Sequence, residues 1–140
     1  MENLDIAKFG GTSVGNFDAM TSSYKVVVGN KNSRIVVISA CSGVTNLLVE
    51  LASGKCSDSK INEIIEKLRD IHEQIIIHLE NQHELRNYIE GHLKEIKEQT
   101  LLANKGTNDQ LTDSRVSHGE LMSSYLCVAL FKHYGTDAQW

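Results

Sequence analysis

The segment Lys8-Phe9-Gly10-Gly11-Thr12-Ser13-Val14 decides the fold that we expect for this chain. The apolar run before it, residues 4–9, predicts a β-strand, and a helical pattern begins a few residues after it. Strand alternation makes Lys8 the charged tip of an apolar face, a costly position unless an anion meets it. The two glycines allow backbone N–H groups to approach such an anion, and the next helix N-terminus adds free donors. The strand, loop and helix together predict a phosphate site.

A simpler interpretation accounts for the same residues without a bound ligand. Two glycines after a strand often form only a tight turn, and a lysine at the end of a strand is usually solvated. The segment is neither a Walker loop, in which the lysine follows the glycines, nor G-x-G-x-x-G. Both interpretations stay open on spacing alone.

Composition indicates a single globular domain. The chain has 140 residues, of which 41% are hydrophobic and 23% charged, and its net charge is −4. There is no basic stripe for nucleic acid, no apolar run long enough to span a membrane and no signal-peptide pattern. Cys41, Cys56 and Cys127 are widely spaced, and six scattered histidines lack metal-ligand spacing. We therefore expect no disulfide, no metal site and reduced thiols in a cytoplasmic protein.

The next elements predict a βαβ unit. Apolar residues recur at helical spacing over residues 17–28, and Ile35-Val36-Val37-Ile38 is typical of a strand buried on both faces of a parallel sheet. This second strand ends in another hydroxyl-rich loop, residues 39–46, which opens a helix. Ligands bind at the carboxyl ends of such strands, so Ser39 and Thr45 are candidate site residues. Ordinary turn and N-cap chemistry accounts for them equally well.

The second half of the chain predicts helices. Apolar stripes over residues 61–79 and 85–96 indicate an antiparallel helical hairpin for packing or subunit contact, and residues 104–108 read as a turn. A helix from about Thr112 to Tyr134 is apolar nearly all round, as in a buried helix. It nevertheless carries Glu120 on a stripe of small residues, so either a ligand pairs with this carboxylate, or a backbone N–H or Lys8 does. The final residues, 138–140, look like the start of another strand, which predicts a truncated protein.

Three segments together resemble the aspartate kinases of the amino-acid kinase family. They are residues 7–14 (AKFGGTSV), residues 37–48 (VISACSGVTNLL) and residues 117–123 (SHGELMS). The hairpin and the third segment are most similar to the lysine-sensitive, monofunctional type. The resemblance implies an α/β fold: the N-terminal part of the amino-acid kinase fold, with parallel strands covered by helices and a long helical hairpin insertion. It also implies that residues 1–140 form the N-terminal portion of a catalytic domain without its nucleotide half and its regulatory ACT domains.

The resemblance further implies an activity, transfer of the γ-phosphoryl group of MgATP to the β-carboxylate of L-aspartate in amino-acid biosynthesis. By motif, Lys8 faces the transferring phosphoryl group, Gly10, Gly11, Thr12 and Ser13 surround the phosphates, and Ser39, Thr45 and Glu120 hold aspartate. Mg²⁺ would be bound through the nucleotide phosphates, and the full-length parent would be a homo-oligomer. The family's G-R-G-G-S-D segment has no counterpart, so we expect little activity from these residues alone.

Two alternatives remain at this stage. The chain could come from another amino-acid kinase, acting on glutamate, acetylglutamate, carbamate or a nucleoside monophosphate. It could also be a non-catalytic binding or assembly module that uses its helical hairpin for partner contact. Glu120 favours a substrate with a free α-ammonium group, because a carboxylate pairs with that cation.

Overall fold

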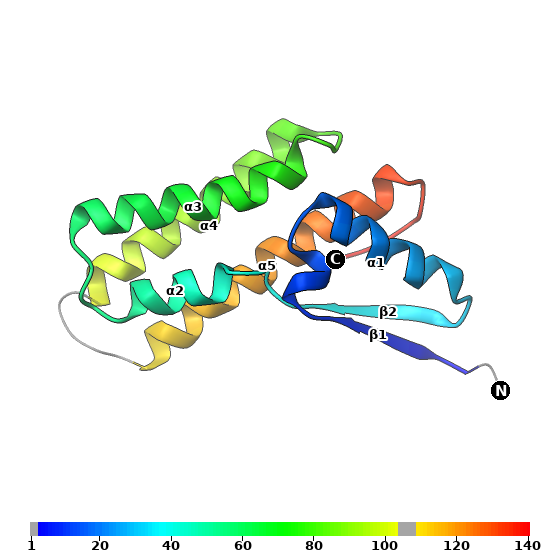
Figure 1. Ribbon diagram of the computed structural model, residues 1–140, viewed down its shortest axis with the longest axis horizontal. Helices are drawn as coiled ribbons and strands as arrows, with labels where there is room; N and C mark the ends of the chain where they lie inside the picture. The colour runs from blue at the N-terminus through cyan, green and yellow to red at the C-terminus, as the bar shows by residue number, and fades with distance from the viewer. Residues whose placement is uncertain (1–2, 104–108) are drawn as a thin grey trace.

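The chain folds as a small parallel sheet and a group of helices (Figure 1). The computed structural model describes residues 3–103 and 109–140, so the predicted turn at 104–108 lies outside the described residues. The elements follow in the order β1 (Asp5–Phe9), η1 (Gly11–Val14), α1 (Phe17–Gly29), β2 (Ser33–Ile38), α2 (Val44–Ala52), α3 (Asp58–Ile76), α4 (Gln82–Ala103) and α5 (Asp109–His133).

The two strands form the predicted βαβ unit. β1 and β2 are parallel and are connected through α1, and the register pairs Lys8 with Val37 and Phe9 with Ile38. Parallel pairing aligns the carboxyl ends of the strands, so the loops that follow Phe9 and Ile38 emerge side by side. This alignment places the two hydroxyl-rich loops at one edge of the sheet.

Within the described part of the chain, other elements cover one face of the sheet. Ala7, Phe9, Val36 and Ile38 pack against the core, and α1 and α5 both contact β2 (Figure 1). The alternate side chains are open: Ile6 is 62% exposed, Ile35 46% and Val37 45%. The prediction that β2 is buried on both faces is therefore wrong for this chain, because the described helices lie on one side of the sheet.

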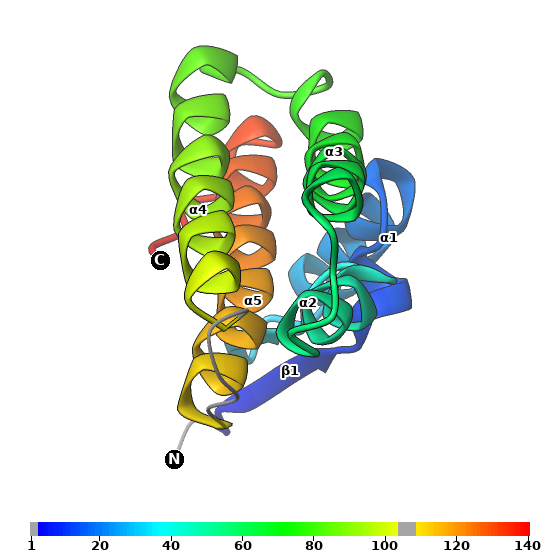
Figure 2. The same cartoon turned by 90° about the vertical axis from the view of Figure 1, so that its left-hand side faces the viewer.

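The helical hairpin is confirmed, with α3 and α4 packed together and α5 lying beside α4 (Figure 2). Asn81, which has a φ of 55°, precedes the first residue of α4 and is of a type that tolerates this left-handed conformation. The apolar stripes of the two helices are buried as expected, at Ile61, Ile64, Ile65, Leu68, Ile75, Leu85, Ile89, Leu93 and Ile96. Ion pairs cross the outer surface, where Arg86 binds Glu73 at 2.6 Å. The hairpin therefore adds a second apolar layer against α5.

Helix α5 is buried over most of its surface, as the sequence predicts, except for a narrow exposed stripe. Met122, Leu126 and Leu130 are fully buried, whereas Leu121 is 37% exposed and Glu120 is also exposed. The helix contacts α1, α2, α3, α4 and β2. The expected burial nearly all round is therefore confirmed, apart from the stripe that carries Glu120.

The end of the chain also differs from the prediction. Gly135, with a φ of 84°, follows the end of α5 as expected, but residues 136–140 form no strand. Instead the Trp140 indole N–H donates to Ser124 Oγ at 2.9 Å, and its ring meets Tyr125 edge-on at 6.0 Å. The final segment thus folds back along α5, where it finds partners that a local pattern does not reveal.

Candidate functional site

The loop after β1 presents exposed polar groups. Lys8 and Thr12 are exposed, and Lys8 forms no ion pair within residues 3–103 and 109–140. The Ser13 carbonyl accepts a 2.7 Å hydrogen bond from Ser23 Oγ of α1, which anchors the far end of the loop. The loop is therefore held in place while its cation stays available.

The two glycines of this loop have different roles. A Cβ at Gly11 would lie 2.8 Å from the Ala40 carbonyl oxygen, a distance that backbone atoms cannot accommodate without moving. Gly11 is therefore required by the neighbouring loop rather than by a ligand. At Gly10 an added Cβ would meet nothing within 4 Å, so this backbone borders open space. Of the two, Gly10 leaves room for a phosphate.

The helix expected a few residues after the loop is α1. A single 3-10 turn, η1, follows Gly10, and α1 begins at Phe17. The Asn16 side chain accepts from the Ala19 N–H at 2.8 Å and so caps that helix. One N–H donor of the first turn is therefore already used, and a contribution of the other donors to a phosphate site stays a prediction.

The loop after β2 joins the first loop through backbone hydrogen bonds. The Ser39 N–H donates to the Phe9 carbonyl and the Ser42 N–H to the Gly11 carbonyl, each at 3.1 Å. Gly43 then adopts a φ of 84°, which glycine allows without strain, and α2 begins at the next residue. Thr45 is exposed in the first turn of α2. Ser39 and Thr45 thus lie on one loop–helix junction beside the first loop.

One turn of α5 reaches this junction. A Cβ at Gly119 would lie 3.0 Å from both Ala40 Cβ and Val44 Cγ1, so the helix backbone passes very close to α2 and the loop before it. Ser123 Oγ donates to the Ser39 carbonyl at 2.7 Å. Glu120, between these two contacts, is exposed and makes no ion pair with any residue in the described part of the chain. The explanation that Lys8 pairs with Glu120 therefore does not hold here.

Three segments that are distant in the sequence meet at the carboxyl ends of the two strands. They approach these ends from different sides. Lys8 alternates with Ala7 and Phe9 and so shares the open face of the sheet, whereas α5 packs on the covered face and brings Glu120 to the edge beyond Ile38. A ligand that contacts both charges must lie across this edge.

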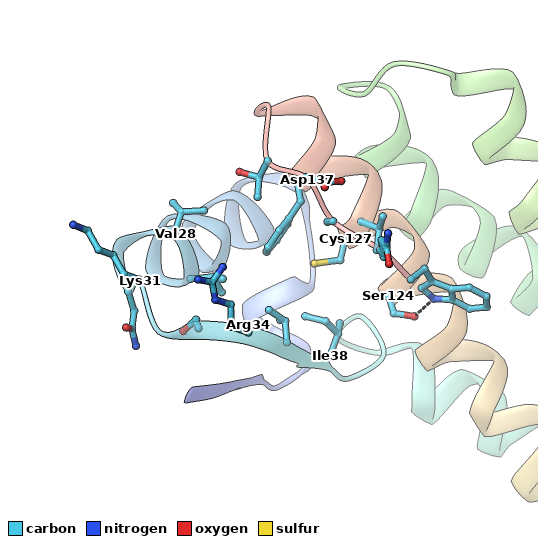
Figure 3. Close-up of a pocket in the computed structure, with 17 residues that line it drawn as sticks. Val28, Lys31, Arg34, Ile38, Ser124, Cys127 and Asp137 are labelled. Atoms are coloured by element: carbon cyan, nitrogen blue, oxygen red, sulfur yellow. Dashed lines mark hydrogen bonds between the residues drawn. The ribbon is translucent and has the colours of Figure 1, made fainter. Parts of the chain in front are cut away.

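A well-defined hollow lies away from this edge. A groove of about 640 Å³ runs between β2, the end of α1, α5 and the final segment, and none of the predicted site residues lines it (Figure 3). Lys31 and Arg34 lie toward one end of the groove, and the Ser124–Trp140 hydrogen bond lies at the other. The sequence analysis did not predict this groove. It assigned residues 138–140 to a strand, whereas in the structure these residues form one wall of the groove.

Two of the thiols, those of Cys41 and Cys127, are buried. Burial raises the pKa of the Cys41 thiol to about 12 and that of the Cys127 thiol to about 12, so both stay protonated at neutral pH. The structure pairs none of the three cysteines in a disulfide. Residues 3–103 and 109–140 bring no three metal-ligating side chains together, and none of their helices has the length and apolar character for crossing a bilayer.

The fold and the edge geometry define a class: an α/β lobe like the N-terminal part of an aspartokinase. No protein-family model matches the chain. Over all 140 residues it is 41% identical to lysine-sensitive aspartokinase 3 of Escherichia coli (strain K12), and it covers 31% of that protein. The crystal structure of E. coli aspartokinase III with aspartate and ADP matches 99% of this chain with a TM-score of 0.95 and 40% identity, and 31% of that chain is covered.

A second state of the same enzyme is equally similar. The structure of E. coli aspartokinase III with lysine and aspartate matches the whole chain with a TM-score of 0.94 and 41% identity, again covering 31% of that chain. The chain therefore spans about a third of the length of these relatives. The fold predicted from the three motifs is confirmed, including its helical hairpin.

Proposed function

We propose that this chain is the aspartate-facing and phosphate-facing part of an aspartate kinase. That enzyme transfers the γ-phosphoryl group of ATP to the β-carboxylate of L-aspartate and forms 4-phospho-L-aspartate. The observation that carries the proposal is the meeting of both strand-end loops with the Glu120 turn of α5, marked by the Ser123–Ser39 hydrogen bond of 2.7 Å. Similarity to aspartokinase 3 over all 140 residues supports it.

Lys8 and the first loop serve the phosphoryl group. Phosphoryl transfer requires mainly positioning and electrostatic stabilisation of the equatorial oxygens. Lys8 supplies an exposed cation that has no ion-pair partner among the described residues. The open space at Gly10 admits a phosphate close to the backbone, and Gly11, Thr12 and Ser13 complete the loop. No side-chain nucleophile is needed, because the aspartate carboxylate is ionised near neutral pH. The protonated thiols are consistent with this division of roles.

Glu120, Ser39 and Thr45 hold the substrate. Glu120 is exposed and unpaired among the described residues, so its carboxylate is free to bind the α-ammonium group of aspartate. The Ser39 carbonyl is already occupied by Ser123, which fixes the backbone from which the Ser39 hydroxyl projects. Aspartate lies across the carboxyl edge, with its β-carboxylate toward Lys8.

ATP is the phosphoryl donor, in line with the ADP in the related crystal structure. Residues 8–15 contain no carboxylate, so Mg²⁺ arrives bound to the nucleotide phosphates rather than on this loop. We place the parent enzyme in the cytoplasm, as a homo-oligomer in the biosynthesis of lysine and related amino acids. The 140 residues alone have little or no kinase activity, because they span about a third of their relatives and lack a G-R-G-G-S-D segment.

A non-catalytic assembly module is the second candidate. The observation that favours it is the open apolar sheet face formed by Ile6, Ile35 and Val37, which is suited to contact with another polypeptide. Self-association of the 140 residues without any response to aspartate would support this candidate over the kinase.

A chimeric enzyme tests the catalytic role of Lys8. The 140 residues replace the matching N-terminal part of E. coli aspartokinase 3, and aspartate-dependent hydroxamate formation is measured. Lys8→Ala should lower kcat on the order of 100-fold, since one transition-state charge contact is worth about 3 kcal/mol. Lys25→Ala, at an exposed lysine of α1, is the matched control and should leave kcat unchanged. Near-normal kcat in Lys8→Ala would remove that residue from the mechanism.

The same chimera tests substrate binding. Glu120→Gln should raise the KM for aspartate more than it lowers kcat, because the lost charge pairs with the α-ammonium group in the ground state and in the transition state alike. Glu98→Gln, at an exposed position of α4, controls for the loss of one carboxylate. Equal KM values for the two variants would show that Glu120 does not bind substrate.

A further inference from the structure

Two histidine rings connect the helical hairpin to α5. His92 of α4 and His118 of α5 approach each other with their Nδ1 atoms 2.6 Å apart and their rings inclined at 74°. His118 is only 6% exposed, and His92 is half-buried. A separation of 2.6 Å is a hydrogen-bond distance, so one hydrogen atom lies between the two nitrogens.

A neighbouring carboxylate favours one position for that hydrogen by electrostatic attraction. Glu95 Oε2 lies 3.6 Å from His118 Nε2, and a carboxylate only accepts. We therefore assign the hydrogen of neutral His118 to Nε2, which leaves its Nδ1 as the acceptor and His92 Nδ1–H as the donor. A first added proton binds His92 Nε2 and keeps this hydrogen bond. A second can bind only at His118 Nδ1, where it would set two N–H groups against each other.

The surroundings of the pair oppose added protons. Burial lowers the pKa of both rings, and the pKa of His92 is lowered further by His118, while Glu95 raises both. On α3, the fully buried His72 interacts electrostatically with His92. On α4, Tyr88 packs edge-on against His92 at 4.6 Å. Both rings are therefore neutral at pH 7, and their hydrogen bond is intact.

His118 belongs to the α5 turn that forms the candidate site. The next residue, Gly119, packs against Ala40, and Ser123 donates to the Ser39 carbonyl. This turn is thus held between the hairpin on one side, through His92, and the loop after β2 on the other. A shift of α5 at His118 changes the distance of Glu120 from that loop.

We propose that His92 is a positioning residue, which through His118 holds the Glu120 turn of α5 against the loop after β2 and releases it when both rings become protonated. The inference deepens the proposed function, because it makes the hairpin a determinant of aspartate binding. Aspartate affinity falls on acidification below the ordinary histidine range, where both rings become protonated.

NMR on the 140-residue chain tests the coupling without requiring activity. Ring and backbone amide signals are followed from pH 8 to pH 5 in the wild type, in His92→Phe and in the control His83→Gln, an exposed histidine of the same helix. In the wild type and the control, the chemical shift of the Ser39 amide should change with pH at the same midpoint as the ring signals of His118. In His92→Phe the pH midpoint of the His118 ring should rise, because neutral His118 loses the hydrogen bond donated by His92. The chemical shift of the Ser39 amide should then no longer change at that midpoint.

A second variant and a second measurement make the result decisive. His92→Gln retains an N–H donor that does not titrate, so it should keep the wild-type Ser39 signal at pH 8 even if His92→Phe unfolds. Aspartate is then titrated into the wild type at pH 7.5 and pH 5.5. If the Ser39 amide and the His118 ring titrate together but no signal changes on addition of aspartate, the positioning role of His92 is supported and the proposed function is not. The proposal that His92 positions the turn through His118 is refuted if the Ser39 amide shift does not change as the rings titrate. It is also refuted if the pH dependence of that shift is the same in His92→Phe as in the wild type.

Discussion

Replacing Gly119 by alanine tests the close approach of α5 to the candidate site. Alanine in a helix interior is favoured over glycine by about 1 kcal/mol. At Gly119, however, the new Cβ would lie 3.0 Å from Ala40 Cβ and from Val44 Cγ1, and overpacking of this kind costs typically about 1–3 kcal/mol. The net expectation for Gly119→Ala is a change between about zero and 2 kcal/mol of destabilisation.

Gly91 provides the matched control, because it lies inside α4 and an added Cβ meets nothing within 4 Å. Gly91→Ala should stabilise the chain by about 1 kcal/mol through helix propensity alone. The difference between the two variants, about 1–3 kcal/mol, therefore measures the steric contact at Gly119. Urea unfolding followed by far-UV circular dichroism gives both free energies. If Gly119→Ala stabilises the chain as much as Gly91→Ala, then α5 does not pass close to Ala40 and the geometry of the edge is wrong.

Two further predictions concern stability. Ser123→Ala removes the 2.7 Å hydrogen bond to the Ser39 carbonyl and should cost about 1 kcal/mol in urea unfolding, whereas Ser22→Ala, at an exposed serine of α1, should change little; equal losses would contradict the contact. His72 is fully buried, and burial lowers its pKa below the value of 6.5 that it has in the unfolded chain. On acidification the unfolded chain therefore takes up a proton at a higher pH than the folded chain, so the free energy of unfolding decreases as the pH falls below 6.5. The fall should approach about 1.4 kcal/mol per pH unit for this histidine, and a pH dependence unchanged in His72→Leu would refute its part.

The sequence alone determined the local elements and the edge at which the site lies. Alternating and helical spacings depend on neighbouring residues, so they predicted both strands, the helical hairpin and the helix that carries Glu120. Parallel pairing places the carboxyl ends of the two strands, Phe9 and Ile38, side by side. The two hydroxyl-rich loops that follow these strands were therefore enough to predict that both loops lie at the same edge of the sheet. The roles of Lys8 and Glu120 rest on motif similarity and stay predictions.

Only the tertiary structure decided which contacts hold the edge together. Gly11 is needed because the Ala40 carbonyl passes close by, and His92 meets His118 across two helices. Trp140 turns back to Ser124 instead of opening a strand. Such contacts join residues far apart in the chain, so neither partner leaves a periodic pattern near the other. Their energies depend on the distance between the two groups in space, and that distance is set only when the helices pack.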